Sequence, residues 1–393
     1  MSFPFPRARL LTILCYGAMM SLAIGINLLP VFLTTLSSVF GGEAGALTNE
    51  QLGRLGACVF SGLVVGILIT GPLADRFGAK VFALLGDGLV AGGLLGMALA
   101  PNYAVLAAML FVLGFGSGLL DMVLSPVVAA LNPTRRAAAM NWLHSFYCVG
   151  AAVTILGGSL TLRMGLGWRG SCLALLPLPV LLFVALSLQR FPGMTTKGAR
   201  TPFFQLCRDH WFMLALAAIF LGGAAEMGMA QWLPAYAERS LGFSAWTGGM
   251  ALLLFSVAMA LGRMVIGAAE ARWPAFAIMI VSCLSSVVLF GLGSFLPWSM
   301  PALICCILVG FTGSCLWPTM LAVTADRYPD GGASMFGALA ALGNAGGIFM
   351  PWLVGWVADW SNLHWGLVTS AIAPILMWLV LRRMRNSRPA KSR

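Results

Sequence analysis

Three carboxylates lie inside long apolar stretches of this 393-residue chain, where an ionisable side chain is costly. The other nine of its twelve acids fall in polar links or at the ends of apolar runs, which leaves Asp87, Asp121 and Glu226. An acid at the centre of a membrane helix costs ~2.5–3.5 kcal/mol on insertion scales, so it normally faces a bundle interior or an aqueous cavity. Burial also favours the neutral acid, which suits proton exchange.

We therefore predict Asp121 and Glu226 as proton-coupling residues. A structural alternative stays open for each, because a buried acid can equally serve a hydrogen bond to a neighbouring helix. For Asp87 the structural interpretation is preferred.

A polar stripe lies near the start of the apolar run 137–163. Asn141, His144 and Tyr147 are spaced i, i+3, i+6, which places them on one face of a helix. Amides and carboxylates match sugar hydroxyls, and an aromatic face covers the apolar side of a sugar ring. For His144, a hydrogen bond to a backbone carbonyl remains an equal alternative. The predicted substrate-binding residues are Asn27, Asn141, His144, Tyr147, Gln231, Trp232, Trp317 and Asn344.

The segment 71–80 reads G-P-L-A-D-R-F-G-A-K. It resembles the G-x-L-a-D-r-x-G-r-k signature of the major facilitator superfamily. Glycine allows a tight turn, and an aspartate suits a positive helix N-terminus. An ordinary charged turn is the alternative, and the counterpart around Gly262-Arg263 is degenerate. The resemblance implies a cytoplasmic gate formed by Gly71, Asp75, Arg76, Gly78 and Lys80.

Further segments resemble the fucose–galactose–glucose symporter family within that superfamily. Residues 118–126 read G-L-L-D-M-V-L-S-P, like that family's acid followed by a small residue and proline. Residues 140–151 read M-N-W-L-H-S-F-Y-C-V-G-A, similar to its N-x-x-H/Q-x-F-x-x-x-G-A pattern. Residues 223–233 read G-A-A-E-M-G-M-A-Q-W-L, like its G-x-E-x-x-x-x-x-W-L run. The resemblance implies a sugar carrier driven by an ion gradient, with His144 as a donor to sugar hydroxyls.

One departure from that family concerns the coupling ion. The family's symporters can carry a second acid in the first span, where this chain has Asn27. An amide cannot carry a proton, so three possibilities stay open: proton coupling, sodium coupling through Asp121, or no coupling ion.

The elements that must position these residues are membrane helices. The chain is 60% hydrophobic and only 9% charged, too little charge for a water-facing globule of this size. Each span needs ~20 apolar residues, and the long runs lack the alternation of a membrane barrel. The predicted spans are 10–36, 52–74, 80–100, 103–129, 137–163, 170–188, 211–237, 245–268, 274–294, 299–325, 332–358 and 364–381.

The placement of charge predicts the orientation of the bundle. With both termini inside, 19 of the 23 Lys and Arg fall in inner links or the tail, Arg263 among them. The positive-inside rule then places both termini in the cytoplasm, and we expect a bacterial inner-membrane protein. Arg7 and Arg9 before the first run are typical of a retained signal anchor. The net charge of +11 is thus a topology signal and predicts no nucleic-acid partner.

Matching residue pairs recur at a spacing of 196, which is half the chain length. Gly114 recurs as Gly310, and Gly150 as Gly346. Two parallel repeats predict an all-α membrane protein with twelve helices in two pseudo-symmetric six-helix bundles. The predicted division is a bundle 1–188, a cytoplasmic linker 189–210, and a second bundle 211–393 with a basic tail.

The predicted function is alternating-access symport of a hexose-like sugar with an ion, by a carrier that acts as a monomer. An exporter of drugs is the first alternative, although the Asn, His and Gln set argues mildly against it. An enzyme is not predicted, because the sequence lacks hydrolase, zinc-protease and P-loop motifs. A sensor or scaffold on a carrier fold would be expected to have long soluble appendages. The nine scattered cysteines fit small buried hydrophobes, and neither a metal nor another cofactor is predicted.

Overall fold

The computed structural model describes residues 5–41, 45–133, 136–192, 203–269, 272–328 and 331–386. Within these ranges the regular elements are helices, and twelve stretches are long and apolar enough to cross a membrane. The predicted helical membrane fold is therefore confirmed. The helices are α1 (Phe5–Val31), α2 (Leu33–Phe40), α3 (Asn49–Phe77), α4 (Ala79–Leu99), α5 (Tyr103–Leu131), α6 (Arg136–Arg163), α7 (Gly167–Leu175), α8 (Pro177–Ser187), α9 (Phe203–Leu206), α10 (His210–Arg239), α11 (Ala245–Ala269), α12 (Ala275–Phe295), α13 (Ser299–Gly313), α14 (Leu316–Arg327), α15 (Gly332–Trp360), α16 (Leu363–Thr369) and α17 (Ile372–Asn386).

Three of the spans consist of two helices each. The sixth span joins α7 to α8, the tenth joins α13 to α14, and the twelfth joins α16 to α17. Pro177 opens α8, where its missing N–H does no harm, but it cannot continue the hydrogen bonding of α7. Such interruptions are tolerated in membranes where neighbouring helices cover the freed backbone groups.

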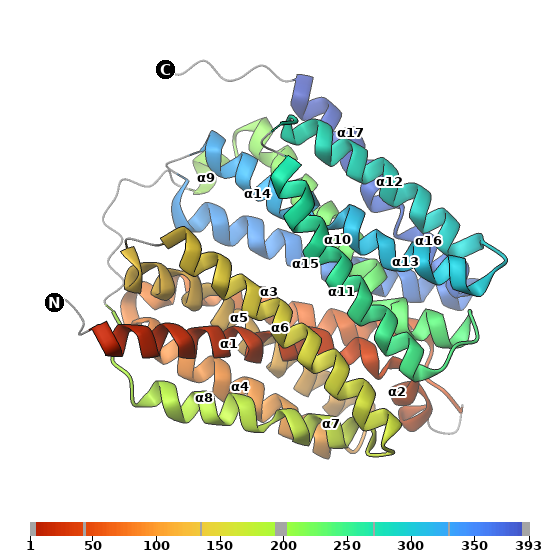
Figure 1. Ribbon diagram of the computed structural model, residues 1–393, viewed down its shortest axis with the longest axis horizontal. Helices are drawn as coiled ribbons and strands as arrows, with labels where there is room; N and C mark the ends of the chain where they lie inside the picture. The colour runs from red at the N-terminus through yellow and green to blue at the C-terminus, as the bar shows by residue number, and fades with distance from the viewer. Residues whose placement is uncertain are drawn as a thin grey trace.

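Two groups of helices stack on each other in Figure 1, α1–α8 in one and α10–α17 in the other. Repeated glycines show that the two groups are built alike. A Cβ on Gly114 of α5 would strike the carbonyl of Val59 in α3, and one on Gly310 of α13 would strike that of Phe255 in α11. The fourth span thus packs on the second as the tenth packs on the eighth.

The second glycine pair repeats the same relation. Gly150 of α6 lies against the backbone of Met20 in α1, and Gly346 of α15 lies against the carbonyl of Phe220 in α10. The fifth span therefore meets the first as the eleventh meets the seventh. The spacing of 196 seen in the sequence reflects equivalent helix contacts in the two halves.

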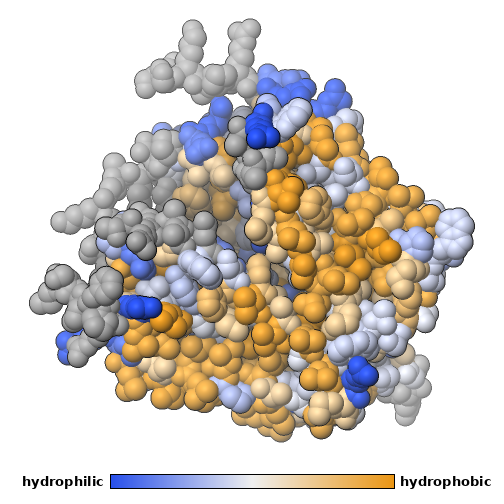
Figure 2. Space-filling view, in the orientation of Figure 1, coloured by the Kyte–Doolittle hydropathy of each residue, from blue (hydrophilic) through white to orange (hydrophobic). Residues whose placement is uncertain are grey.

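The outer surface of the bundle is apolar. Figure 2 shows hydrophobic residues over most of the visible face. Large aliphatic side chains are well exposed, including Leu188 (78%) and Met264 (72%). Exposed apolar surface of this extent fits contact with lipid.

Candidate functional site

Polar side chains of α1 and α6 meet on the inner side of the first half. Asn27 donates to the carbonyl of Ala23 (2.9 Å) and lies 3.4 Å from the Tyr147 hydroxyl, to which it also donates. His144, one turn before Tyr147, is exposed. The first half thus presents an amide, a phenol and an imidazole side by side. These groups suit hydroxyl recognition.

Asp121 lies on α5, one turn after Ser117, whose hydroxyl donates to the carbonyl of Leu113 (3.0 Å). The Asp121 side chain is partly exposed, and it makes no hydrogen bond or ion pair with another residue that the structure describes. An acid in a membrane helix without a structural partner is free to exchange a proton. This observation favours the functional over the structural interpretation of Asp121.

Asp87 behaves differently from Asp121. It is fully buried, and neither of its carboxylate oxygens accepts a hydrogen bond from the described residues. It lies on α4, next to Gly86, which packs against Leu120 of α5. Asp87 is therefore enclosed within the first half.

In the second half, Glu226 of α10 forms an ion pair with Arg263 of α11 at 3.7 Å between Oε2 and Nη2. The Arg263 side chain is 34% exposed and that of Glu226 11%. The sequence analysis counts Arg263 among the inner links, but the structure places it within a membrane-spanning helix. Its pairing with Glu226 explains why a guanidinium is tolerated there.

The ion pair of the second half lies close to the polar stripe on α6 of the first half. Arg263 of α11 and Glu226 of α10 lie within electrostatic range of α6, the helix that carries His144 and Tyr147. The helices α6 and α11 also pack against each other. The pair in the second half and the polar stripe in the first half therefore belong to one region.

The remaining predicted ligands of the second half differ in exposure. Trp232 is fully buried, and its indole donates to the carbonyl of Pro351 (2.9 Å), which gives it a packing role. Asn344 is partly exposed and donates to the carbonyl of Ala340 (3.0 Å). Gln231 Nε2 and Trp317 Nε1 are buried without a hydrogen-bond partner among the described residues. Such donors are costly unless a ligand or a water completes them.

The gate segment lies where α3 turns into α4. Gly78 has φ 82°, a conformation that suits glycine, and joins the two helices. Lys80 Nζ donates to the carbonyls of Ser187 (2.6 Å) and Gln189 (2.8 Å), so it holds the end of α8. Arg76 is exposed, and its guanidinium lies 5.3 Å from the ring centroid of Phe77. A Cβ added to Gly71 would have only the Met122 side chain within contact distance.

For two of the predicted site residues the structure describes the backbone alone. The backbones of Asp75 and Asn141 lie in α3 and α6, but their side chains are outside the described residues. Their roles remain predictions.

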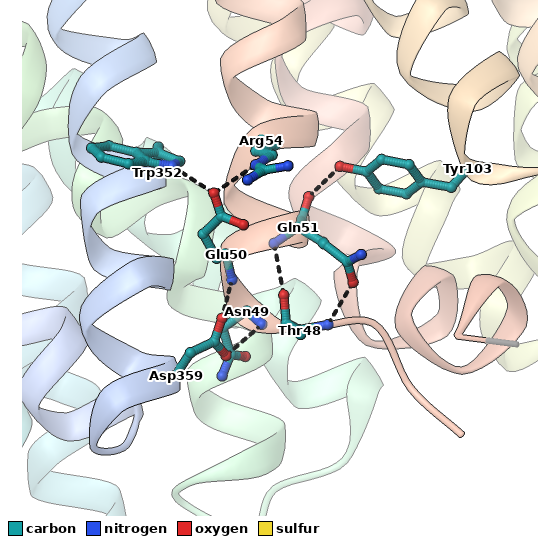
Figure 3. A network of polar contacts seen from close by, with 8 residues as sticks. All are labelled: Thr48, Asn49, Glu50, Gln51, Arg54, Tyr103, Trp352 and Asp359. Carbon is teal, nitrogen blue, oxygen red and sulfur yellow. Dashed lines mark hydrogen bonds and ion pairs between the residues drawn. The ribbon is translucent and has the colours of Figure 1, made fainter. Parts of the chain in front are cut away.

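A network that the sequence analysis missed joins the two halves at the end of the bundle that carries α2 (Figure 3). Asp359, in the last turn of α15, accepts hydrogen bonds from the backbone N–H groups of Asn49 (2.7 Å) and Glu50 (2.6 Å). The carboxylate of one half thus caps the first turn of α3 in the other half. Glu50 in turn accepts from the Trp352 indole (2.9 Å) and from Arg54. We call Asn49, Glu50, Trp352 and Asp359 the clasp.

Other contacts reinforce the clasp. Thr34 donates to Glu238 (2.7 Å), and Arg239 donates to the Asn49 side chain (3.1 Å). A Cβ on Gly53 of α3 would come within 2.7 Å of the Pro351 carbonyl in α15. Backbone meets backbone here, so the α2 end is tightly closed.

At the opposite end the hydrogen bonds we describe stay within one half. Asn132 donates to Thr12 (3.1 Å) in the first half, and Tyr328 donates to Asp209 (2.6 Å) in the second. The apolar core follows the same division. One cluster fills the first half along its length and joins the second half, while a separate cluster that includes Phe212 fills the end of the second half opposite α2. The bundle is therefore closed at the α2 end.

The only local signal for the clasp in the sequence is a helix start. Thr48 accepts from the backbone of Gln51, whose side chain accepts from the Thr48 backbone, a capping box. That pattern predicts where α3 begins. It carries no information on the residue, 310 positions away in sequence, that completes the cap.

Two similar bundles of membrane helices, closed together at one end and with charged residues inside their spans, define a polytopic carrier-type membrane protein. A family model described as the Major Facilitator Superfamily matches residues 14–307 and 284–393. The chain belongs to this superfamily.

Relatives and solved structures agree with this assignment. The chain is 28% identical to the gentisate transporter of Corynebacterium glutamicum over 87% of this chain and 81% of that protein. It is 26% identical to the enterobactin exporter of Salmonella paratyphi A over 85% of this chain and 84% of that protein. A crystal structure of the E. coli fucose:proton symporter superposes with a TM-score of 0.66 at 18% identity, covering 97% of this chain and all (100%) of that one. This likeness shows the fold.

Proposed function

We propose that the protein is a secondary active carrier that moves a hexose-like sugar together with a proton by alternating access. The observation that carries the proposal is the position of the charged groups. Asp121 and the Glu226–Arg263 pair lie on membrane helices of opposite halves, and the halves are joined at one end. A carrier needs such a site between two bundles that rock around it.

Different residues engage the proton and the sugar in this proposal. Asp121 takes up and releases the proton, because no described residue engages its carboxylate. Asn27, His144, Tyr147 and Asn344 bind the hydroxyls of the sugar, while Trp232 only holds α10 to α15. The fucose:proton symporter, which has the same fold, supports a sugar and a proton as the transported pair. With both termini on the cytoplasmic side of a bacterial inner membrane, the clasp lies on the periplasmic side and the described state faces inward.

The test is uptake of labelled hexoses into proteoliposomes under an imposed pH gradient. We expect wild type to accumulate sugar and Asp121→Asn to exchange sugar without accumulation, since an amide cannot carry the proton. Asp326→Asn, an exposed acid at the end opposite the clasp, is the matched control and should accumulate sugar normally. Accumulation by Asp121→Asn equal to wild type would contradict the assignment of the proton.

Export is the second candidate, because one relative is named an enterobactin exporter. The same vesicles distinguish the two directions. A proton-driven exporter would accumulate an amphipathic dye inside everted vesicles and leave labelled hexoses unmoved.

A further inference from the structure

Arg263 is incompletely satisfied in its position between the halves. Its Nε donates to the carbonyl of Ser314 (3.3 Å), and its Nη2 lies 3.7 Å from Glu226 and 3.7 Å from the sulfur of Met259. A guanidinium offers five N–H donors. Its Nη1 has no partner among the residues that the structure describes.

The geometry of the ion pair is unlike that of a structural salt bridge. Charge-assisted N–H···O bonds are about 2.7–2.9 Å long, and arginine commonly binds a carboxylate through two parallel bonds. Glu226 makes one long contact instead, and a third of the Arg263 side chain remains exposed (34%). Glu226 therefore neutralises the guanidinium without filling its binding face.

A neutral solute would offer no charged partner to Arg263 Nη1, which has none among the described residues. Ionisable residues within membrane spans commonly mark substrate or ion pathways. Hydroxyl groups alone are recognised by amides and phenols, which Asn27 and Tyr147 already supply. A guanidinium fork adds recognition of a planar anion, above all a carboxylate or phosphate.

The opposite wall of the same region carries the groups that bind hydroxyls. The helix that carries Arg263, α11, packs against α6, which carries His144 and Tyr147, and Tyr147 accepts from Asn27 on α1. One ligand with a charged end and a hydroxylated body would engage both walls.

We propose that the substrate is a sugar acid, whose carboxylate binds Arg263 in place of Glu226 while its hydroxyls face Asn27 and Tyr147. This inference rests on the proposed function and specifies its substrate. The displaced Glu226 then takes up a proton. The charged and titratable groups around it are Arg263 on α11 and, on α6, Tyr147 and Cys148. The substrate anion and this proton enter together, so the net charge around Arg263 is unchanged, and Asp121 carries its own proton as in the proposed function.

A pair of ligands that differ only in charge tests the inference on the wild-type protein. Labelled glucuronate and its neutral methyl ester are offered to proteoliposomes under a pH gradient, with labelled glucose as reference. We expect glucuronate to be taken up at least tenfold faster than the ester. Equal uptake of the acid and the ester would overturn the inference.

Substitutions of Arg263 provide the second measurement. Arg263→Gln should lose the preference for glucuronate over the ester, and Arg263→Lys should retain part of it, since lysine keeps the charge but not the fork. Arg169→Gln is the control, because Arg169 bonds the carbonyls of Ala98 and Ala100 away from this region. An unchanged preference in Arg263→Gln would contradict the assignment.

The outcomes separate this inference from the proposed function. Gradient-driven uptake of glucose without uptake of glucuronate would overturn the sugar acid and leave the sugar carrier standing. No uptake of glucose, ester or glucuronate by wild type would overturn both.

Discussion

The two ends of the bundle are held together in different ways. At the α2 end, a carboxylate from α15 caps a helix of the other half, and Gly53 brings the backbones of α3 and α15 into contact. At the opposite end, the hydrogen bonds we describe, such as those of Lys80, remain inside one half. The contrast indicates that the polar contacts between the halves are concentrated at the clasp.

The clasp has a physical property that a surface ion pair lacks. A carboxylate at a helix N-terminus is stabilised by hydrogen bonds from two backbone N–H groups and by the helix dipole. Both hydrogen bonds break when the helix moves away. An exposed ion pair gains little, because solvent screens it whether the halves are open or closed. A helix cap shared between the halves therefore stabilises the closed state relative to the open state more than an exposed ion pair does.

The largest expected effect comes from steric obstruction of the closed end. Gly53→Leu places a side chain where even a Cβ meets the Pro351 carbonyl at 2.7 Å. We expect the α2 end to stay open and transport to fall below a tenth of wild type. Gly92→Leu in α4 is the control, since a Cβ there meets nothing within 4 Å. Spin labels across the α2 end report closure, and a closed Gly53→Leu would contradict the account.

The next effect comes from the shared helix cap. Asp359→Asn keeps the shape but removes the charge that faces the α3 N-terminus. Loss of a negative charge beside a helix N-terminus costs about 0.3–2 kcal/mol. Closed-to-open ratios should therefore fall by about two- to thirtyfold. Asp326→Asn, exposed at the other end, should leave the ratio unchanged. The same spin-label distances measure both variants.

At the opposite end a substitution is expected to change stability and to leave closure of the α2 end unaffected. Lys80→Met removes the two hydrogen bonds to the end of α8. Each such bond contributes on the order of 1–2 kcal/mol, so the melting temperature in detergent should drop. The α2-end distances should not change, because Lys80 connects elements of one half. A shift in those distances would mean that the two ends are not separable.

The smallest effect is expected for the exposed ion pair of α3. Arg54 is 60% exposed in its side chain, and it pairs with Glu50 one turn earlier. Such pairs contribute roughly 0.3–0.5 kcal/mol, so Arg54→Gln should alter the closed population by less than about threefold. An effect as large as that of Asp359→Asn, measured by the same labels, would assign the closure to Arg54 instead of the cap.

Much of the fold could be predicted from the sequence, because long apolar runs and repeated glycines depend on local composition. The spans and the equivalence of Gly114 with Gly310 follow from such patterns. The clasp could not be predicted, since Asp359 and Asn49 meet only through tertiary packing. Acids at helix ends are common in membrane proteins, and nothing in their spacing distinguishes Asp359.

The candidate site was predictable only in part for the same reason. Asp121 and Glu226 stand out as acids within apolar runs. Arg263 lies near the end of its span, where a positive charge also fits an inner link, so its role depends on its proximity to Glu226. Trp232 looks like a sugar ligand by its residue type, yet its indole bonds Pro351 inside the packing.

The account depends most on the claim that the halves close at one end as they open at the other. Distance measurements between paired spin labels test this claim in one set of proteoliposomes. One pair, at Ser38 and Ser361, is exposed at the α2 end, and the other, at Phe77 and Asp326, is exposed at the opposite end. The account predicts two populations whose proportions shift with pH and substrate, in which the first distance lengthens as the second shortens. Distances that lengthen or shorten together, or that never change, would contradict it.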